Sequence, residues 1–178
     1  IASEIDQTEI STMLTYSPGR KTTGYGVERT VINDGDFPRL FFNYAVGIKD
    51  VFSSDFEYEK VQFYYRHPWQ LGGVGKLTTT LEAGKTFGEV PLGLLNVVPG
   101  NQTLFSIYGT YPLLDFYEFV TDTYTSVHLE HNFNGRFLGR IPLLRDLNLR
   151  EIVAVRAVTG SISDENQALN ASYSNPVL

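Results

Sequence analysis

A two-residue alternation of apolar and polar side chains between residues 121 and 160 constrains this chain more than any other feature. Val127 and Leu129 fall on one face of an extended segment, whereas His128 and Glu130 fall on the other. Period two is the period of a β-strand whose faces meet different surroundings. A second alternating segment follows a connection rich in Gly, Arg and Leu, so the stretch predicts two neighbouring strands. A soluble sheet and a membrane barrel both produce this pattern, and alternation does not say which face lies outward.

The same alternation recurs along the chain and predicts an all-β fold of about seven strands in an antiparallel, up-and-down sheet, without a convincing helix. Many of the segments are roughly eight to ten residues long, which approaches a tilted strand crossing a bilayer and exceeds the usual globular strand. The clearest apolar row in the first half is formed by Leu40, Phe42, Tyr44, Val46 and Ile48. The predicted strands lie near residues 9–16, 25–32, 39–49, 60–66, 76–83, 124–133 and 153–159.

The connections between these strands differ in length, being short at residues 33–38 and 68–75 and longer at residues 17–24, 49–56 and 87–119. Short turns on one rim and long loops on the other are typical of outer-membrane barrels. The 87–119 connection is rich in apolar side chains, so we expect it to fold back against the sheet. Residues 135–148 combine Leu and Ile with Arg, and we expect them at the membrane interface.

Composition narrows the function classes. The 178 residues carry a net charge of −6 and suit a single domain. The acidic balance and the lack of a Lys/Arg cluster of the nucleic-acid-binding type argue against a nucleic-acid partner. The sequence has no Cys, which excludes a disulfide scaffold, a thiolate metal site and a Cys nucleophile. The longest apolar run, near residues 90–98, is too short for a membrane helix, although a barrel strand needs no such run.

Both ends of the sequence suggest a larger protein. The chain begins at Ile1 without an initiator Met or a signal segment, so we expect a processed chain or a part of a longer one. Residues 161–178 are rich in Ser and Asn and lack long alternation, so they are predicted to form a loop before a further strand. We therefore expect an incomplete barrel whose first and last strands do not pair.

Three stretches, residues 41–61, 81–103 and 117–151, resemble the C-terminal barrel of a family of large Bacteroidota outer-membrane proteins. Along the chain they contain, in order, the short sequence motifs LEAGK, PGN, YEFV, LEHNFNG and IPLLR. Members of that family typically carry an N-terminal carboxypeptidase-regulatory-like domain, which these residues lack, and their barrel is a domain of unknown function. The resemblance implies a location and a fold but no activity, and it transfers no catalytic residue. The 129–160 hairpin is distantly similar to surface-antigen barrels that assemble outer-membrane proteins, but residues 87–119 contain no Arg for their Arg-Gly-aromatic loop.

The alternating segments supply candidate interior and lipid-facing residues. The apolar row near residues 40–48 is expected to face lipid, as are Val127 and Leu129. Aromatic residues near strand ends are expected to be either core or an interfacial girdle; they are Tyr16, Tyr44, Tyr65, Trp69, Tyr124 and Phe133. The polar residues predicted to face the barrel interior are Lys60, Gln62, Glu82, His128, Glu130 and Arg156.

No motif indicates catalysis or a cofactor. His128 and Glu130 share a strand face but His131 points the other way, which disfavours a metal site. Gly72-Gly73-Val74-Gly75-Lys76 lacks the spacing of a phosphate-binding loop and predicts a tight turn. The carboxylates are scattered over several strands and no Gly-x-Ser-x-Gly elbow occurs, so we expect neither an enzyme nor a cofactor.

Residues 1–178 are thus predicted to form one segment of a barrel in the outer membrane of a Gram-negative bacterium. That segment would anchor periplasmic domains and serve in transport or assembly, with outer-membrane lipid and other envelope proteins as its partners. The alternative is a soluble periplasmic or secreted β-barrel that binds a small apolar ligand in its interior. The alternative reverses the polarity of the two faces.

Overall fold

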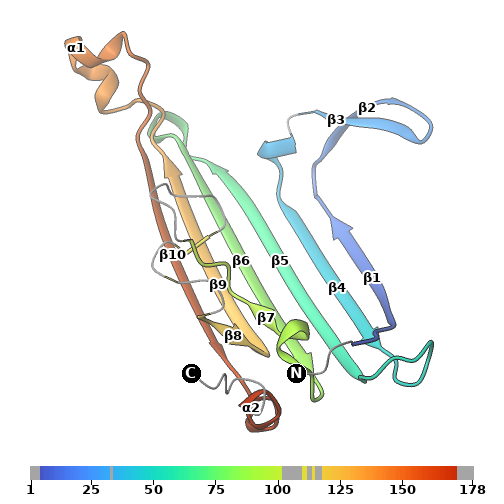
Figure 1. The fold of residues 1–178 in the computed structure, drawn as a ribbon. Coiled ribbons are helices and arrows are strands. Elements are labelled where there is room, and N and C mark those ends of the chain that lie inside the picture. The colour runs from blue at the N-terminus through green and yellow to red at the C-terminus, as the bar shows by residue number, and fades with distance from the viewer. Residues whose placement is uncertain (1–4, 33, 102–109, 112–113, 115–117, 172–178) are drawn as a thin grey trace.

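The computed structural model describes residues 5–32, 34–101, 110–111, 114 and 118–171, and six long antiparallel strands dominate it (Figure 1). The strands are β1 (Glu9–Tyr16), β4 (Arg39–Gly47), β5 (Tyr58–Gln70), β6 (Lys76–Phe87), β9 (Thr123–Asn132) and β10 (Ile152–Ser161). They pair in the order β1-β4-β5-β6-β9-β10, so each strand lies beside the long strand before it in sequence. This is the predicted up-and-down sheet, with six long strands in place of about seven.

The sheet is open. Within the described residues β1 pairs only with β4 and β10 only with β9, so the first and last strands do not pair with each other. The expectation of an unclosed sheet is confirmed. None of the described helices has the length and apolar content needed to cross a bilayer.

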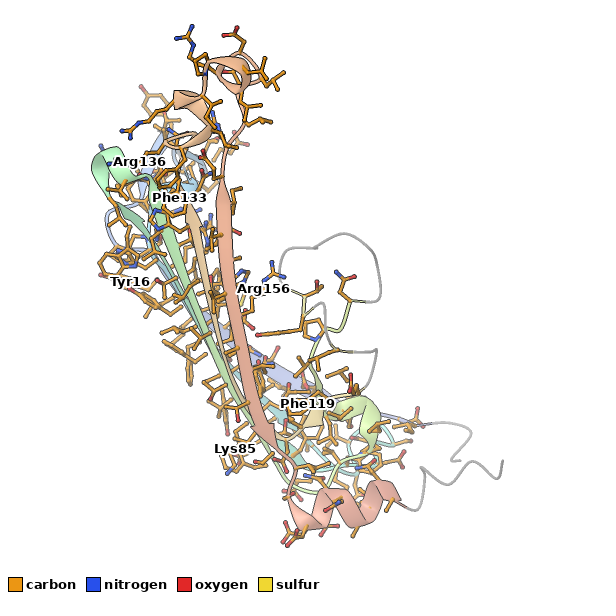
Figure 2. The ribbon with its side chains drawn as sticks, turned by 90° about the vertical axis from the view of Figure 1, so that its left-hand side faces the viewer. Tyr16, Lys85, Phe119, Phe133, Arg136 and Arg156 are labelled. Atoms are coloured by element: carbon orange, nitrogen blue, oxygen red, sulfur yellow. The ribbon has the colours of Figure 1, made fainter. Side chains whose placement is uncertain are left out.

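Only one side of the sheet is covered in the described residues. The connection from β6 to β9 contains the 3-10 turn η3 (Leu92–Leu94) and the short pair β7 (Asn96–Val97) and β8 (Val120–Thr121). Figure 2 places Phe119 of this connection on the same side as Arg156, and Tyr16 and Lys85 on the opposite side. Buried Val90, Leu95 and Val98 anchor the connection, as the apolar content of this loop predicts. Phe105, Tyr108 and Pro112, which belong to the same apolar connection, lie outside the described residues.

A small apolar core lies where this connection meets the end of the sheet. Tyr58, Val90 and Leu95 are buried together, with partly buried residues packed around them. Because so few large side chains are fully buried, the described residues hold no continuous core of the kind that fills a soluble sandwich. The partly buried neighbours are Phe56, Leu94, Val120 and Ile162.

The predicted strand near residues 25–32 is confirmed only for Glu28–Ile32, because a hairpin turn separates these residues from a second short strand before them. Strands β2 (Lys21–Tyr25) and β3 (Glu28–Ile32) pair with Tyr25 opposite Glu28, which leaves a two-residue turn. Gly26, the first turn residue, has a φ of 62°, which suits a type II′ hairpin turn. Residues 17–38 are therefore one long connection from β1 to β4, and η1 (Asp34–Asp36) ends it at the predicted turn.

This hairpin weakens the predicted division into a short-turn rim and a long-loop rim. The rim at the C-terminal end of β1 carries the β1–β4 connection. It also carries the tight β5–β6 turn with η2 (Gly72–Val74). The β9–β10 connection, with η4 (Leu138–Arg140) and α1 (Pro142–Arg145), lies at the same rim. That rim thus has two long connections and one short turn. The opposite rim carries the 48–57 and 88–122 connections.

The predicted loop after residue 161 is also wrong, because α2 (Asp164–Ala171) begins there. The Ser163 hydroxyl accepts a hydrogen bond from the Asn166 amide at 3.4 Å, and two acidic residues occupy the first turn. Both features favour a helix start. They were present in the sequence, but a helix of eight residues lacks the apolar periodicity that marks longer helices.

A buried polar network docks α2 against the β6 end. The Asn166 side-chain oxygen accepts the Val90 amide at 2.9 Å, and its nitrogen donates to Gly88 O and to an Asp122 carboxylate oxygen, both at 3.2 Å. The Ser163 amide donates to the same Asp122 oxygen at 2.6 Å. Burial raises the pKa of the Asp122 carboxyl, but the hydrogen bonds from Ser163 and Asn166 outweigh burial and hold the pKa below its usual range.

Replacing Asn166 with Ala should release α2. The change leaves the buried Val90 amide and the Asp122 carboxylate with fewer partners, so we expect the free energy of unfolding to fall by about 2–3 kcal/mol. Hydrogen exchange at the Gln167 amide, bonded to Ser163 O at 2.8 Å, should report the loss of docking. Gln167→Ala, the exposed neighbour on the same helix, is the control and should change stability by less than about 0.5 kcal/mol. Equal effects of the two changes would contradict the docking role of Asn166.

The docking of α2 should also depend on pH. Because the Asp122 pKa is lower in the folded chain than in the unfolded chain, its contribution to stability is complete above the unfolded pKa of about 3.9. The contribution is lost as pH falls through the lower, folded value. Protection of the Gln167 amide should therefore be constant from neutral pH down to about pH 5 and decline only below the unfolded value. In Asp122→Asn, this acid-dependent decline should disappear.

Candidate functional site

The sheet presents one polar face and one apolar face. In an antiparallel pair, residues directly opposite each other project to the same side, so the register assigns every side chain to a face. Gln62 of β5 lies opposite Asn43 of the neighbouring strand β4 and opposite Gly84 of the other neighbour, β6. Gly84 in turn lies opposite Tyr124 of β9. We call the face that carries these residues, and that the β6–β9 connection covers, the inner face; the opposite face is the outer face.

All six polar residues predicted to share a face lie at inner-face positions. Glu82 lies opposite Ser126, His128 opposite Arg156, and the remaining members follow in step along their strands. His131, one residue out of step, lies on the outer face and its Nε2 donates to Val74 O at 3.0 Å. Whether the inner face lines a barrel interior stays a prediction. The six residues are Lys60, Gln62, Glu82, His128, Glu130 and Arg156.

Four of the six line one cavity between the sheet and the β6–β9 connection. The cavity has a volume of about 250 Å³. Its floor is the inner face, with Gln62, Glu82, His128 and Arg156 from four different strands, and its roof includes residues 96–99 and Tyr111. Lys60 and Glu130 are not among its lining residues. The cavity therefore joins polar groups that are far apart in sequence and leaves two of the predicted residues at other places on the same face.

A row of basic residues crosses the inner face at one level. Arg39 of β4 lies opposite Arg66 of β5, which lies opposite Thr80 of β6. Thr80 lies opposite His128 of β9, which lies opposite Arg156 of β10. Like charges directly opposite each other in a sheet are usually destabilising, so the direct pairing of Arg39 with Arg66 is unusual. Only His128 and Arg156 of this row were predicted to share a face, because the pairing of five strands cannot be deduced from alternation within each one.

Arg156 connects the inner face to the connection that covers it. Its Nε donates to His128 Nε2 at 3.0 Å, and one terminal nitrogen donates to Thr110 O at 2.6 Å. Since His128 accepts at Nε2, its ring is neutral in this arrangement and carries its proton on Nδ1. The Tyr111 hydroxyl adds a longer contact to Ala157 O at 3.5 Å. Arg156 thus positions the roof of the cavity through a charge-assisted hydrogen bond.

Lys60 and Tyr124 occupy separate surroundings on the same face. The Lys60 ammonium lies 4.9 Å from the centre of the Tyr58 ring, and the Tyr58 hydroxyl donates to a Glu9 carboxylate oxygen at 2.6 Å. Tyr124 lies across Gly84, where a Cβ would overlap its ring. Tyr124, one of the aromatic residues predicted to be core or girdle, is partly buried on the polar inner face. Gly84 is needed because it lets the ring lie close to the sheet.

The acidic and histidine side chains of the described residues do not gather into a metal-binding cluster. No group of three or more His, Asp or Glu side chains among them is placed to hold a metal ion. Glu82, Glu130 and Asp122 belong to different surroundings, and Asp122 is committed to the network that docks α2. The inner face is a polar surface on which the strand register fixes the positions of hydrogen-bonding and basic side chains.

Removing the Arg156 guanidinium should loosen the roof of the cavity. Arg156→Leu deletes a hydrogen bond from a charged donor, which is worth about 1.5–3 kcal/mol, so exchange of the Asn101 and Tyr111 amides should rise by about tenfold or more. In the wild-type chain these amides bond to Tyr111 O and Pro99 O. Arg66→Leu removes another arginine of the same row, on β5, and should leave their exchange unchanged. If both variants accelerate exchange equally, Arg156 does not position the roof specifically.

Comparison with known proteins gives one match. The model of a protein family, described as the C-terminal domain of a family of unknown function (DUF5686), matches residues 3–166. No curated protein matches the chain, and no solved structure does. The expected resemblance to a C-terminal domain of unknown function is thus confirmed, whereas its Bacteroidota source and its neighbouring regulatory-like domain stay predictions. Because the match extends over most of the sequence, the chain belongs to the DUF5686 family and corresponds to its C-terminal domain.

Proposed function

We propose that this chain is a membrane-embedded section of an outer-membrane β-barrel. In this proposal the outer face contacts lipid, the inner face lines a polar interior, and the barrel anchors periplasmic domains of the full protein. The β6–β9 connection lies inside the barrel and narrows it. The polar inner face suits a role in transport or assembly, and we assign the chain no enzymatic role.

The single observation that carries the proposal is the continuous apolar outer face of the sheet. Phe42, Phe63 and Val155 project from three different strands and are 42%, 39% and 61% exposed, although they are large hydrophobic residues. An uncovered apolar surface of this extent on a soluble monomer would favour association or aggregation. Against lipid, the same surface is in its preferred environment. Further outer-face members are Leu40, Val61, Leu81, Val127, Leu129 and Val153.

The height of this apolar zone fits a bilayer. On β5, outer-face residues from Val61 to Trp69 span nine positions, close to the roughly nine to eleven residues of a tilted membrane strand. At one end, Tyr65, His67 and Trp69 form a run of neighbouring rings, with 3.9 Å between the last two ring centres. At the other end, the charged residues Glu59 and Lys85 occupy outer-face positions next to the apolar zone. Aromatic rings followed by charge are typical of a membrane–water interface.

The two open edges favour further strands from the same barrel. The free sides of β1 and β10 leave backbone N–H and C=O groups without partners in the sheet. In hydrocarbon each such group costs several kcal/mol, so a sheet in lipid must close on itself. We propose that strands from the rest of the full-length protein pair with both edges.

The alternative, a soluble barrel for a small apolar ligand, requires the opposite arrangement of faces. Its interior would be apolar and its exterior polar. Here the face covered by the β6–β9 connection carries Gln62, Glu82, His128 and Arg156, while the uncovered face is apolar. The polarity of the faces therefore favours the membrane proposal.

Substituting Arg at Val127 tests the direction of the faces. Val127 lies mid-strand on the outer face, so Val127→Arg should reduce the folding free energy in lipid by about 2–4 kcal/mol. Glu130→Arg, on the inner face of the same strand, should cost less than about 1 kcal/mol because it remains in the polar interior. Urea titration of the full-length protein in liposomes would measure both, after fractionation has located it in the membrane. A wild-type protein that is soluble and monomeric without detergent would overturn the proposal.

A further inference from the structure

The β9–β10 connection forms an exposed apolar surface beyond the end of the sheet. We call residues 135–150 the rim segment; it contains η4 and α1 and extends beyond the end of β9 and the start of β10 (Figure 1). Leu143 is 85% exposed and Leu147 62% exposed. A connection in water rarely exposes this many large apolar side chains so close together. Phe137, Ile141 and Leu149 are also exposed.

The same segment concentrates positive charge in an acidic chain. It contains four arginines and one aspartate, so its formal charge is +3, whereas the whole chain carries −6. Arg136 donates to Gly73 O, and Arg145 lies 3.8 Å from Asp146 with both side chains largely exposed. Arg140 and Arg150 are exposed, and no ion pair involves either within the described residues. Apolar and basic side chains are thus interspersed on one short, exposed segment.

Specific contacts hold the rim segment at the level where the apolar outer face ends. A Glu151 carboxylate oxygen accepts the Phe137 amide at 3.0 Å and also the Leu138 amide, and the Leu138 contact contributes most to holding the Glu151 pKa below its usual range. The rings of His131 and Phe133 stack with centres 4.1 Å apart, and Phe133 meets Phe137 edge-on at 5.2 Å. Because His131 lies on the outer face, this aromatic row connects that face to the rim segment.

We propose that the rim segment binds the surface of the bilayer, inserting Leu143 and Leu147 among the lipids and binding the phosphate groups of anionic phospholipids through Arg140 and Arg150. The inference rests on the membrane location proposed above and adds a lipid preference to it. Segments that lie in the interface combine apolar side chains with Lys or Arg in this way. A basic residue near an anionic surface contributes about 1 kcal/mol, which corresponds to about a fivefold local enrichment of anionic lipid.

The insertion can be measured with single labels, because the 178 residues contain no Cys and any Cys elsewhere in the full-length protein can first be replaced with Ser. Leu143→Cys and Phe42→Cys would each carry an environment-sensitive fluorophore in the full-length protein reconstituted into nanodiscs. Nitroxide-labelled lipids should quench Phe42→Cys when the nitroxide is deep in the acyl chain and Leu143→Cys when it is close to the headgroup. If lipid quenches neither label, the membrane location itself is wrong. If lipid quenches Phe42→Cys but not Leu143→Cys, only the rim inference fails, and a protein partner then covers the segment or water surrounds it.

The choice of lipid is a separate measurement. Energy transfer from the Leu143→Cys label to headgroup-labelled phosphatidylglycerol should exceed transfer to equally labelled phosphatidylcholine, with a severalfold local enrichment of the anionic lipid. The double variant Arg140→Gln with Arg150→Gln should abolish this preference, whereas the matched double Lys variant should retain most of it. Inorganic phosphate at millimolar concentration should not compete, because a single free ion lacks the apolar contacts. Equal transfer to both lipids, or competition by phosphate, would overturn the assignment to anionic lipid.

Discussion

The separation of polar from apolar residues depends on the backbone hydrogen-bond register of the central strands. β5 and β6 pair from Glu59–Phe87 to Gln70–Lys76, and β6 continues in step with β9 from Lys76–Asn132 to Lys85–Thr123. A slip of one residue in either ladder would move every side chain of a strand to the opposite face. Such a slip would place His128 and Glu130 among the outer-face apolar residues. The long ladders therefore fix the faces, and the faces in turn fix which residues can meet.

The distribution of burial differs from that of a soluble sandwich. The fully buried apolar cluster is confined to one end of the sheet, around Tyr58, Val90 and Leu95, while large apolar residues along the outer face remain exposed. In water such a sheet gains little from the burial of its apolar face. In the proposed bilayer that face needs no covering layer of protein. The buried polar contacts at the end of the sheet, centred on Asn166 and Asp122, then serve to hold α2 and the β6–β9 connection in place.

The cavity on the inner face depends on side chains from several strands acting together. Arg156 contributes to the basic row, bonds His128 and holds the backbone of the connection above it. The same side chain therefore determines both the polarity of the cavity and the position of its roof. Small residues have a related effect, since Gly84 leaves space for the Tyr124 ring. The cavity is consequently a product of several strands and cannot be assigned to a local motif.

The sequence by itself determined the strand segments, the two sets of side chains on each strand, the tight turn at residues 72–75 and the family resemblance. The strand segments, the faces and the turn follow from period two and from local turn chemistry, which act over a few residues. The family resemblance rests instead on the order of short sequences such as LEAGK, LEHNFNG and IPLLR. Local signals also existed for the β2–β3 hairpin at Gly26 and for the start of α2 at Ser163, although short elements carry too few residues for periodicity to reveal them. Only the tertiary structure decided which face is covered, because alternation is symmetric between the two sides of a strand. The row from Arg39 to Arg156 likewise required the register of five strands, since residues so distant in sequence become neighbours only through long-range backbone pairing.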